Sequence, residues 1–251
     1  MTELYSGTPG SGKSLHAAYR IIEAIEQGKY IIANFPIDMQ YFYKRAKKRK
    51  KVGSFYFVAN SHITPKGLRD FAKANLKPCE EHQCLVVLDE CGCIFNPRAW
   101  NSKGRQDWID FLINHRKYGY DILMIAQSDM LVDKQIRPLI EKEYKHRSIK
   151  NFQFFGWLLN LLVGGLFIAV EYWYTAKLKC STSLFKLNKR KANIYNSYKI
   201  FDYGEGYQYD ENIYSENQIK VAIPMRVKKK GNRSGKGGRG LTPSRAARAQ
   251  A

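Results

Sequence analysis

Residues 7–14 read GTPGSGKS, and this stretch constrains the fold more than any other feature of the chain. It matches the pattern G-x-x-x-x-G-K-[ST] at every fixed position. A short strand is expected before it, over residues 2–6, and apolar residues at helical spacing follow it over residues 14–27. Strand, glycine-rich loop and helix in this order predict a loop whose backbone N–H groups surround a phosphate.

The residue types in this loop suit a nucleotide with a metal ion. The glycines allow close approach and unusual dihedrals, and Lys13 places a positive charge against the β- and γ-phosphates. The hydroxyl of Ser14 is expected to coordinate Mg²⁺, and the helix N-terminus adds its dipole. The predicted nucleotide site comprises Gly7, Thr8, Pro9, Gly10, Ser11, Gly12, Lys13, Ser14 and Leu15.

A second motif supplies the carboxylates that such a site needs. Residues 84–88 read CLVVL, a continuous apolar run typical of a covered parallel strand, and Asp89 and Glu90 follow it directly. The strand would deliver both carboxylates to the edge of the sheet where the glycine-rich loop also emerges. We expect Asp89 to hold Mg²⁺ through water and Glu90 to orient or deprotonate the attacking water.

Other side chains are weaker candidates for the same chemistry. Gln127 follows an expected strand over residues 121–126, where it would either sense the γ-phosphate or be an ordinary loop residue. Phosphoryl transfer also calls for an arginine, from the same chain or a neighbouring subunit. Arg98, Arg116 and Arg137 are candidates, with Arg116 as the working assignment. Because the chain carries no Asn-Lys-x-Asp motif for guanine, ATP is favoured over GTP.

Strand-like and helix-like segments alternate along the first 150 residues. This rhythm predicts an α/β fold of the P-loop NTPase type with a mostly parallel central sheet. We expect a core over residues 1–150, a helix and strand extension over 151–223, and a disordered basic tail over 224–251. Within these, further strands are expected at residues 30–34, 55–58 and 219–223, and further helices at residues 66–75 and 105–117.

Basic residues are concentrated in two patches. The formal net charge is +20, yet residues 44–51 carry seven Lys or Arg and residues 226–251 carry nine with no acid. Such patches gain free energy by releasing counterions from a polyanion, so nucleic acid and an anionic membrane surface are both candidate partners. A solvated tail that only maintains solubility is the third explanation.

Residues 151–170 contain no formal charge and are long enough to span a membrane. Gly164, Gly165 and Asn160 argue against a span, as does the strand-like character of the sequence from Leu166 onward. We therefore favour a helix that turns at the glycine pair into a strand, and keep a membrane span as the alternative.

Five cysteines in a chain without a secretory signal favour free thiols in the cytoplasm, with association at the host inner membrane left open. A zinc site is the alternative for the cluster around Cys79, His82, Cys84, Cys91 and Cys93, although the spacing fits no usual ligand pattern.

The motifs together resemble the zonular occludens toxin (Zot) family of filamentous-phage assembly ATPases. The resemblance rests on GTPGSGKS, on LVVLDECGCIFNPRAW over residues 85–100, and on NHRKYGYDILMIAQSDMLVDKQIR over residues 114–137. Residues 155–174 and 185–201 also resemble Gram-positive-type members, so the likeness covers most of residues 1–201.

The resemblance implies a RecA-like core related to the DNA-pumping ATPases FtsK and HerA. It also implies ATP-driven extrusion or packaging of single-stranded phage DNA at the host inner membrane, by an oligomeric ring together with phage assembly proteins. The matching residues are Gly7, Gly12, Lys13, Ser14, Asp89, Glu90 and Gln127. Many members carry a transmembrane helix with a domain beyond it, whereas this chain ends in a basic tail, so the toxin activity in the family's name has no support here.

Three functions therefore follow from the sequence. The first is a motor for phage assembly whose basic patches contact single-stranded DNA without reading its bases. The second is a chromosomal or plasmid DNA translocase or packaging ATPase of the same fold. The third is a membrane-associated scaffold in which nucleotide orders the subunits and the basic patches face anionic lipid. Stimulation of ATP turnover by DNA would distinguish a motor from a scaffold.

Overall fold

The structure is a computed structural model, and it describes residues 1–38, 41–42, 53–97, 102–151 and 165–195. Eight strands of these residues form one sheet. In spatial order they are β3 (Ser54–Phe57), β2 (Tyr30–Ala33), β4 (Cys84–Leu88), β5 (Tyr120–Ile125), β1 (Thr2–Ser6), β6 (Lys142–Ser148), β7 (Leu166–Trp173) and β8 (Leu178–Lys186). The pairs from β3 to β6 are parallel, and β7 and β8 add antiparallel strands at one edge. The predicted α/β fold with a mostly parallel sheet is confirmed.

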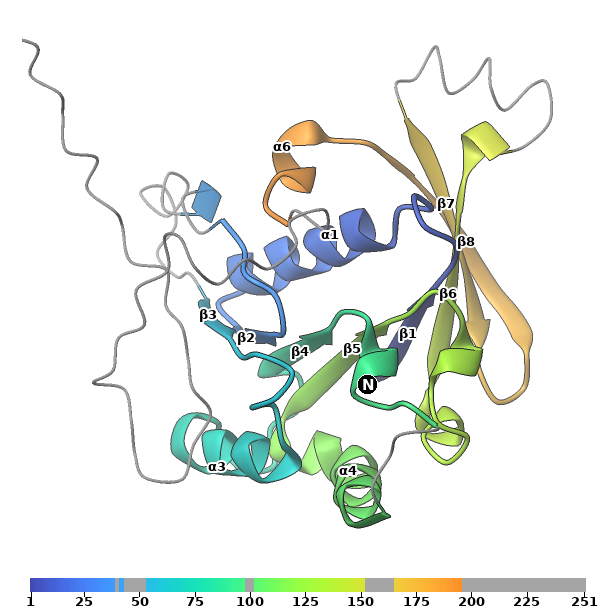
Figure 1. Cartoon of the computed structure of the whole chain (residues 1–251). Coiled ribbons are helices and arrows are strands. Elements are labelled where there is room, and N and C mark those ends of the chain that lie inside the picture. The colour runs from blue at the N-terminus through green and yellow to red at the C-terminus, as the bar shows by residue number, and fades with distance from the viewer. Residues whose placement is uncertain (39–40, 43–52, 98–101, 152–164, 196–251) are drawn as a thin grey trace, which may run out of the picture.

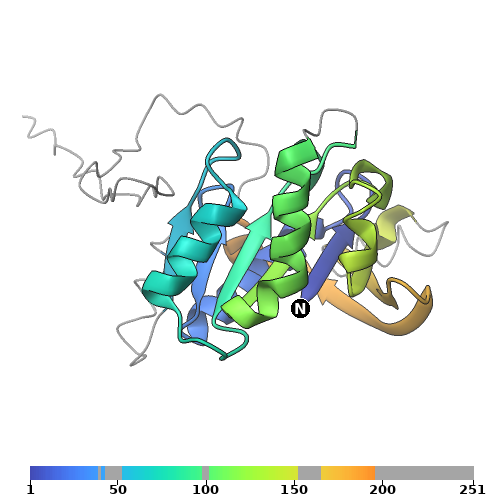
Figure 2. The ribbon, with the colours of Figure 1, turned by 90° about the horizontal axis from the view of Figure 1, so that it is seen from below.

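Helices cover both faces of the parallel part of the sheet. Figure 1 shows α1 (Lys13–Glu26) on one face and α3 (Pro65–Asn75) and α4 (Ser102–Asn114) on the other, and Figure 2 shows α3 and α4 from below. The apolar stripe of α1 packs on one face of the sheet with Ile31, Val87 and Leu123, while the other face packs Val86 and Met124 against α3 and α4. Alternate residues of the same strands therefore serve two cores, which explains the continuous apolar runs.

The first half of the chain follows the expected order of elements. β1 (Thr2–Ser6) leads into α1 (Lys13–Glu26), and β4 (Cys84–Leu88) is the predicted apolar strand. The helix α3 starts at Pro65 because Thr64 caps it, with its side-chain oxygen accepting from the Gly67 N–H at 3.1 Å. The remaining elements of this half are β2 (Tyr30–Ala33), β3 (Ser54–Phe57), α3 (Pro65–Asn75), α4 (Ser102–Asn114) and β5 (Tyr120–Ile125).

The second half departs from the sequence expectations at two strands. β7 (Leu166–Trp173) starts at the residue where a strand was expected, but β6 (Lys142–Ser148) and β8 (Leu178–Lys186) were not predicted. β6 reads KEYKHRS and buries polar side chains, so it lacks the apolar pattern that marks a strand. β8 is an edge strand with little buried surface, and the short α6 (Lys189–Ala192) follows it.

Several predicted segments lie outside the described residues. They include the basic stretch at 44–51, the strand at 219–223, the tail at 224–251, and residues 152–164 of the apolar stretch. Within the described ranges, none of the helices combines the length and the apolar character needed to cross a membrane.

Candidate functional site

The glycine-rich loop joins the carboxyl end of β1 to the start of α1. Its three glycines have backbone angles that other residues rarely adopt, with φ of 144° at Gly7, 73° at Gly10 and 97° at Gly12. A Cβ at Gly7 would lie 2.5 Å from the carbonyl oxygen of His146, and one at Gly12 would lie 2.6 Å from the Phe167 ring. Strands β6 and β7 therefore pack directly against the loop and leave no room for side chains there.

Lys13 is folded back over this loop at the first position of α1. Its Nζ donates to the carbonyl oxygens of Gly7 at 2.6 Å and Thr8 at 3.1 Å. Burial lowers the pKa of Lys13, while the negative charges of Glu90 and Asp89 act to raise it. The ammonium group thus lies within the electrostatic reach of both carboxylates from the end of β4.

The other loop residues differ in how much of them a ligand could reach. Thr8, Pro9 and Gly10 are exposed, whereas Ser11 and Leu15 are buried. The Oγ atom of Ser11 has no hydrogen-bond partner among the described residues. Because the Leu15 side chain points into the protein interior, only its backbone could take part in the predicted nucleotide site.

Asp89 follows β4 and is held by hydrogen bonds from several directions. The Asn34 side chain pairs with its backbone, donating from Nδ2 to the Asp89 oxygen and accepting from the Asp89 N–H, both at 2.7 Å. The backbone N–H of Glu90 donates to Asp89 Oδ1 at 2.9 Å, and the Tyr195 hydroxyl donates to Oδ2. Burial raises the pKa of the Asp89 carboxyl to about 6.

Glu90 adopts the left-handed backbone conformation, with φ of 45°. This conformation costs a residue other than glycine about 1 kcal/mol or more. It turns the chain at the end of β4 so that the Glu90 side chain is exposed beside the half-buried Asp89. The two adjacent carboxylates thus have different surroundings, one desolvated and held, the other in contact with solvent.

Gln127 follows β5, the strand that lies between β1 and β4. Its backbone oxygen accepts a hydrogen bond from the Gly7 N–H at 3.3 Å, and its side chain is exposed. The parallel arrangement thus brings the ends of β1, β5 and β4 to one edge of the sheet, with Lys13, Gln127 and Asp89 along it. This edge is the one at which the sequence placed the site.

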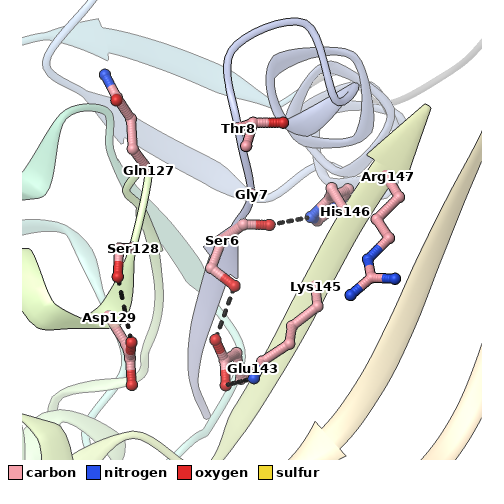
Figure 3. A pocket seen from close by; sticks show the side chains of 10 residues that line it. All are labelled: Ser6, Gly7, Thr8, Gln127, Ser128, Asp129, Glu143, Lys145, His146 and Arg147. Atoms are coloured by element: carbon pink, nitrogen blue, oxygen red, sulfur yellow. Dashed lines mark hydrogen bonds and ion pairs between the residues drawn. The ribbon is translucent and has the colours of Figure 1, made fainter. Parts of the chain in front are cut away.

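A cavity of about 620 Å³ opens beside the start of the loop, where the end of β1, the residues after β5 and strand β6 line it (Figure 3). On its wall lies Glu143, a buried carboxylate that accepts from Ser6 Oγ at 2.7 Å and has Lys145 Nζ 3.7 Å away. The other Glu143 oxygen has no hydrogen-bond partner among the described residues. The lining residues are Ser6, Gly7, Thr8, Gln127, Ser128, Asp129, Glu143, Lys145, His146 and Arg147.

The residues that β6 contributes were missed by the sequence reasoning. Glu143, Lys145 and Arg147 alternate along a strand whose letters give no apolar signal, so nothing marked them as facing one cavity. Asn34 and Tyr195 were missed as well, because their contacts with Asp89 join segments far apart in the chain. Only the pairing of strands and the return of the chain over α1, neither of which the sequence shows, bring these residues together.

A histidine pair supports the loop from the face of the sheet that α1 covers. His146 Nδ1 lies 2.9 Å from the carbonyl oxygen of Tyr144, so this nitrogen carries the proton. Its Nε2 then accepts from His16 Nδ1 at 2.8 Å. Burial lowers the pKa of both rings, to about 4 for His16 and about 3 for His146, so the pair stays neutral.

The two candidate arginines that the structure describes, Arg116 and Arg137, make their hydrogen bonds away from the loop. Arg116 donates to Glu141 at 2.6 Å, and Glu141 in turn accepts from the N–H of Thr2, the first residue of β1. Arg116 therefore lies at the amino edge of the sheet, opposite the loop. Arg137 donates to the backbone oxygens of Val132 and Met130, and Arg98 lies outside the described residues.

The cysteine cluster considered for zinc is not assembled as a metal site. Cys84 and Cys91 are buried, while Cys79 and Cys93 are exposed. Across the part of the chain that the structure describes, no three His, Cys, Asp or Glu side chains gather in a way that could hold a metal ion.

Comparison with known proteins identifies the same family that the sequence motifs resemble. Residues 1–154 match the family model described as zonular occludens toxin (Zot). The chain belongs to the Zot family. The resemblance predicted from the three motif blocks is thereby confirmed over residues 1–154, which include the loop, β4 and β5.

The relatives include the gene 1 proteins of several phages. The gene 1 protein of Enterobacteria phage I2-2 is 32% identical over 163 residues, which are 64% of this chain and 44% of that protein. The gene 1 protein of Enterobacteria phage M13 is 29% identical over 221 residues, which are 84% of this chain and 62% of that protein. The chain therefore spans less than two thirds of the length of these relatives.

Two solved structures illustrate the structural comparisons. The N-terminal domain of zonular occludens toxin from Neisseria meningitidis is 20% identical, with a TM-score of 0.47, over 78% of this chain and 98% of that one. B204, the DNA-packaging ATPase from Sulfolobus Turreted Icosahedral Virus, is 14% identical, with a TM-score of 0.47, over 74% of this chain and 97% of that one. Family membership rests on the sequence match over residues 1–154.

Proposed function

We propose that the chain hydrolyses ATP and that hydrolysis drives filamentous-phage assembly on single-stranded DNA at the host inner membrane. One observation carries the proposal: Lys13, Asp89 and Glu90 lie at the same edge of the sheet, close enough for both carboxylates to act on the pKa of Lys13. Membership of the Zot family and similarity to phage gene 1 proteins support the biological setting.

The residues present suit a magnesium ion. Mg²⁺ prefers a few carboxylate oxygens together with phosphate and water oxygens. The hydroxyl of Ser14 stands next to Lys13, and the Asp89 carboxylate, whose charge acts on Lys13, is held in a fixed position. Ser14 and Asp89 would hold the ion, which supplies positive charge to the β- and γ-phosphate oxygens when bound.

Each protein group then has a defined task in the hydrolysis of ATP. The loop N–H groups bind the phosphates, and Lys13, released from the carbonyl oxygens of Gly7 and Thr8, contacts the β- and γ-phosphates. Glu90 takes a proton from the attacking water, because its carboxylate is exposed at the site edge. Gln127 follows the neighbouring strand β5, and its side chain contacts the γ-phosphate.

Positive charge for the transferring phosphoryl group comes from β6 or from a neighbouring subunit. Lys145 and Arg147 line the cavity that also includes Thr8 and Gln127. Arg116 and Arg137 are engaged elsewhere in their own chain, so either would act only across a ring interface. Sedimentation of the protein with and without ATP tests the ring: a nucleotide-dependent oligomer is expected, and a strict monomer would contradict it.

Single-stranded DNA is the proposed polyanion for the basic stretches at 44–51 and 226–251. A contact of this kind is independent of base sequence and weakens with salt. We expect single-stranded DNA to raise the rate of ATP hydrolysis several-fold at low salt, with the gain shrinking at moderate salt. A rate of ATP hydrolysis that single-stranded DNA does not change would contradict the motor and favour the assembly scaffold. Flotation with anionic liposomes would then test whether the scaffold binds lipid.

A further inference from the structure

The segment that leaves β8 returns across α1 to the nucleotide edge of the sheet. Figure 1 shows α6 beside α1, on the face of the sheet away from α3 and α4. Tyr19 of α1 donates its hydroxyl to the Lys186 oxygen at 2.7 Å, and Lys191 lies over the Tyr19 ring at 4.7 Å. These contacts fasten the segment to the helix that begins at the glycine-rich loop.

The end of this segment is inserted among buried residues rather than lying on the surface. Ile194 and Tyr195 are only 3% and 5% exposed. The Ile194 oxygen accepts from the Asp38 N–H at 3.0 Å, and the Tyr195 ring packs on Phe35 with centroids 4.0 Å apart. Tyr195 therefore has a fixed position beside the carboxyl ends of β2 and β4.

From that position Tyr195 reaches Asp89. Its hydroxyl donates to Asp89 Oδ2, while the backbone N–H of Glu90 donates to Oδ1. Asn34 holds the Asp89 backbone through both its N–H and its oxygen. A hydrogen bond to each carboxylate oxygen prevents the Asp89 side chain from rotating.

We propose that Tyr195 is a positioning residue for Asp89, so that the segment after β8 forms part of the support for the magnesium site. The proposal rests on the function proposed above, in which Asp89 holds Mg²⁺. Groups that hydrogen-bond to metal ligands fix their orientation, and losing one typically weakens metal affinity or activity 10- to 100-fold, roughly. The catalytic edge therefore depends on residues well beyond the family match over residues 1–154.

The test is the Mg²⁺ dependence of nucleotide binding, measured by fluorescence with a labelled, non-hydrolysable ATP analogue. Tyr195→Phe keeps the ring on Phe35 and removes only the hydroxyl. We expect the Mg²⁺ concentration for half-maximal binding to rise about tenfold in Tyr195→Phe, with binding in EDTA unchanged. An unchanged requirement, or a lower one, would overturn the proposal, since a lower one would mean that the hydroxyl obstructs the site.

Two further variants separate the possible causes. Tyr19→Phe removes a hydroxyl contact that holds the same segment but does not touch Asp89, and it should bind like wild type. An equal loss in Tyr19→Phe would assign the effect to a looser segment and overturn the role of the Tyr195 hydroxyl. Asp89→Asn tests the underlying assignment: if its Mg²⁺ requirement stays at the wild-type level, the proposed role of Asp89 fails. If Asp89→Asn raises the Mg²⁺ requirement and Tyr195→Phe does not, the positioning role alone fails.

Discussion

From β3 to β1 the sheet is parallel, mainly apolar and covered by helices on both faces, whereas from β6 to β8 it buries mainly polar side chains and ends in an exposed edge. The first part places the polar groups proposed for the site just beyond the strand ends, as at Asp89 and Gln127. The second part carries them within a strand, as at Glu143 and His146. Yet both parts meet at the same loop.

The difference shows how the site is divided. The apolar half, from β3 to β1, presents the groups proposed for chemistry at the ends of its strands, where they reach a ligand. The polar half, from β6 to β8, packs against the side of the loop, through the His146 oxygen at Gly7 and the Phe167 ring at Gly12. The same type of substitution should therefore cause a different loss of activity or stability in each half.

The largest contrast is expected between two carboxylates. Glu90→Gln removes the proposed base and should lower the rate of ATP hydrolysis about 10²- to 10⁴-fold while ATP still binds. Glu143→Gln keeps an acceptor for the Ser6 hydroxyl, so its rate should fall far less. Single-turnover hydrolysis measures both rates. Equal losses of rate in the two variants would contradict the proposed division of roles between the two halves.

A smaller contrast is expected between two leucines. Leu4 of β1 is fully buried, and Leu4→Ala should lower the free energy of unfolding by about 2–5 kcal/mol through lost contacts and a cavity. Leu184 of β8 is 62% exposed, and Leu184→Ala should change that energy by less than about 0.5 kcal/mol. Urea unfolding of both variants and wild type measures the two changes in the free energy of unfolding. A large loss at Leu184 would mean that β8 is covered in solution.

The smallest effect is a pH dependence specific to the polar half. Burial lowers the His146 pKa from 6.5 to about 3, so between these values the unfolded chain binds a proton that the folded chain does not. Stability should therefore fall as pH drops below 6.5, by about 1.4 kcal/mol per pH unit for this one group.

Unfolding of wild type and His146→Gln between pH 5 and pH 8, roughly the range over which histidines titrate, measures this contribution. The slope below pH 6.5 should be shallower in the variant, because the group that charges on unfolding is gone. The exposed His62→Gln serves as the control and should keep the wild-type slope. Identical slopes in all three proteins would contradict a buried neutral His146.

The apolar half could be predicted from the sequence because its strands and its motif repeat known physical patterns. GTPGSGKS and the run CLVVL before Asp89 locate the loop and a carboxylate without any knowledge of strand order. β6 could not be predicted, because a strand that buries Glu143 and His146 has no apolar period. Tyr195 could not be linked to Asp89 either, since that contact depends on how the chain returns over α1.

The central claim is that the glycine-rich loop is an ATP hydrolysis site, and Lys13→Ala tests it most directly. Phosphate release from ATP with Mg²⁺ would be measured for wild type, Lys13→Ala and, as a control, Lys66→Ala, which removes an exposed lysine of α3. The account predicts turnover in wild type and Lys66→Ala and its loss in Lys13→Ala, because Lys13 places the charge at the β- and γ-phosphates. Turnover that persists in Lys13→Ala, or that is absent from wild type, would contradict it.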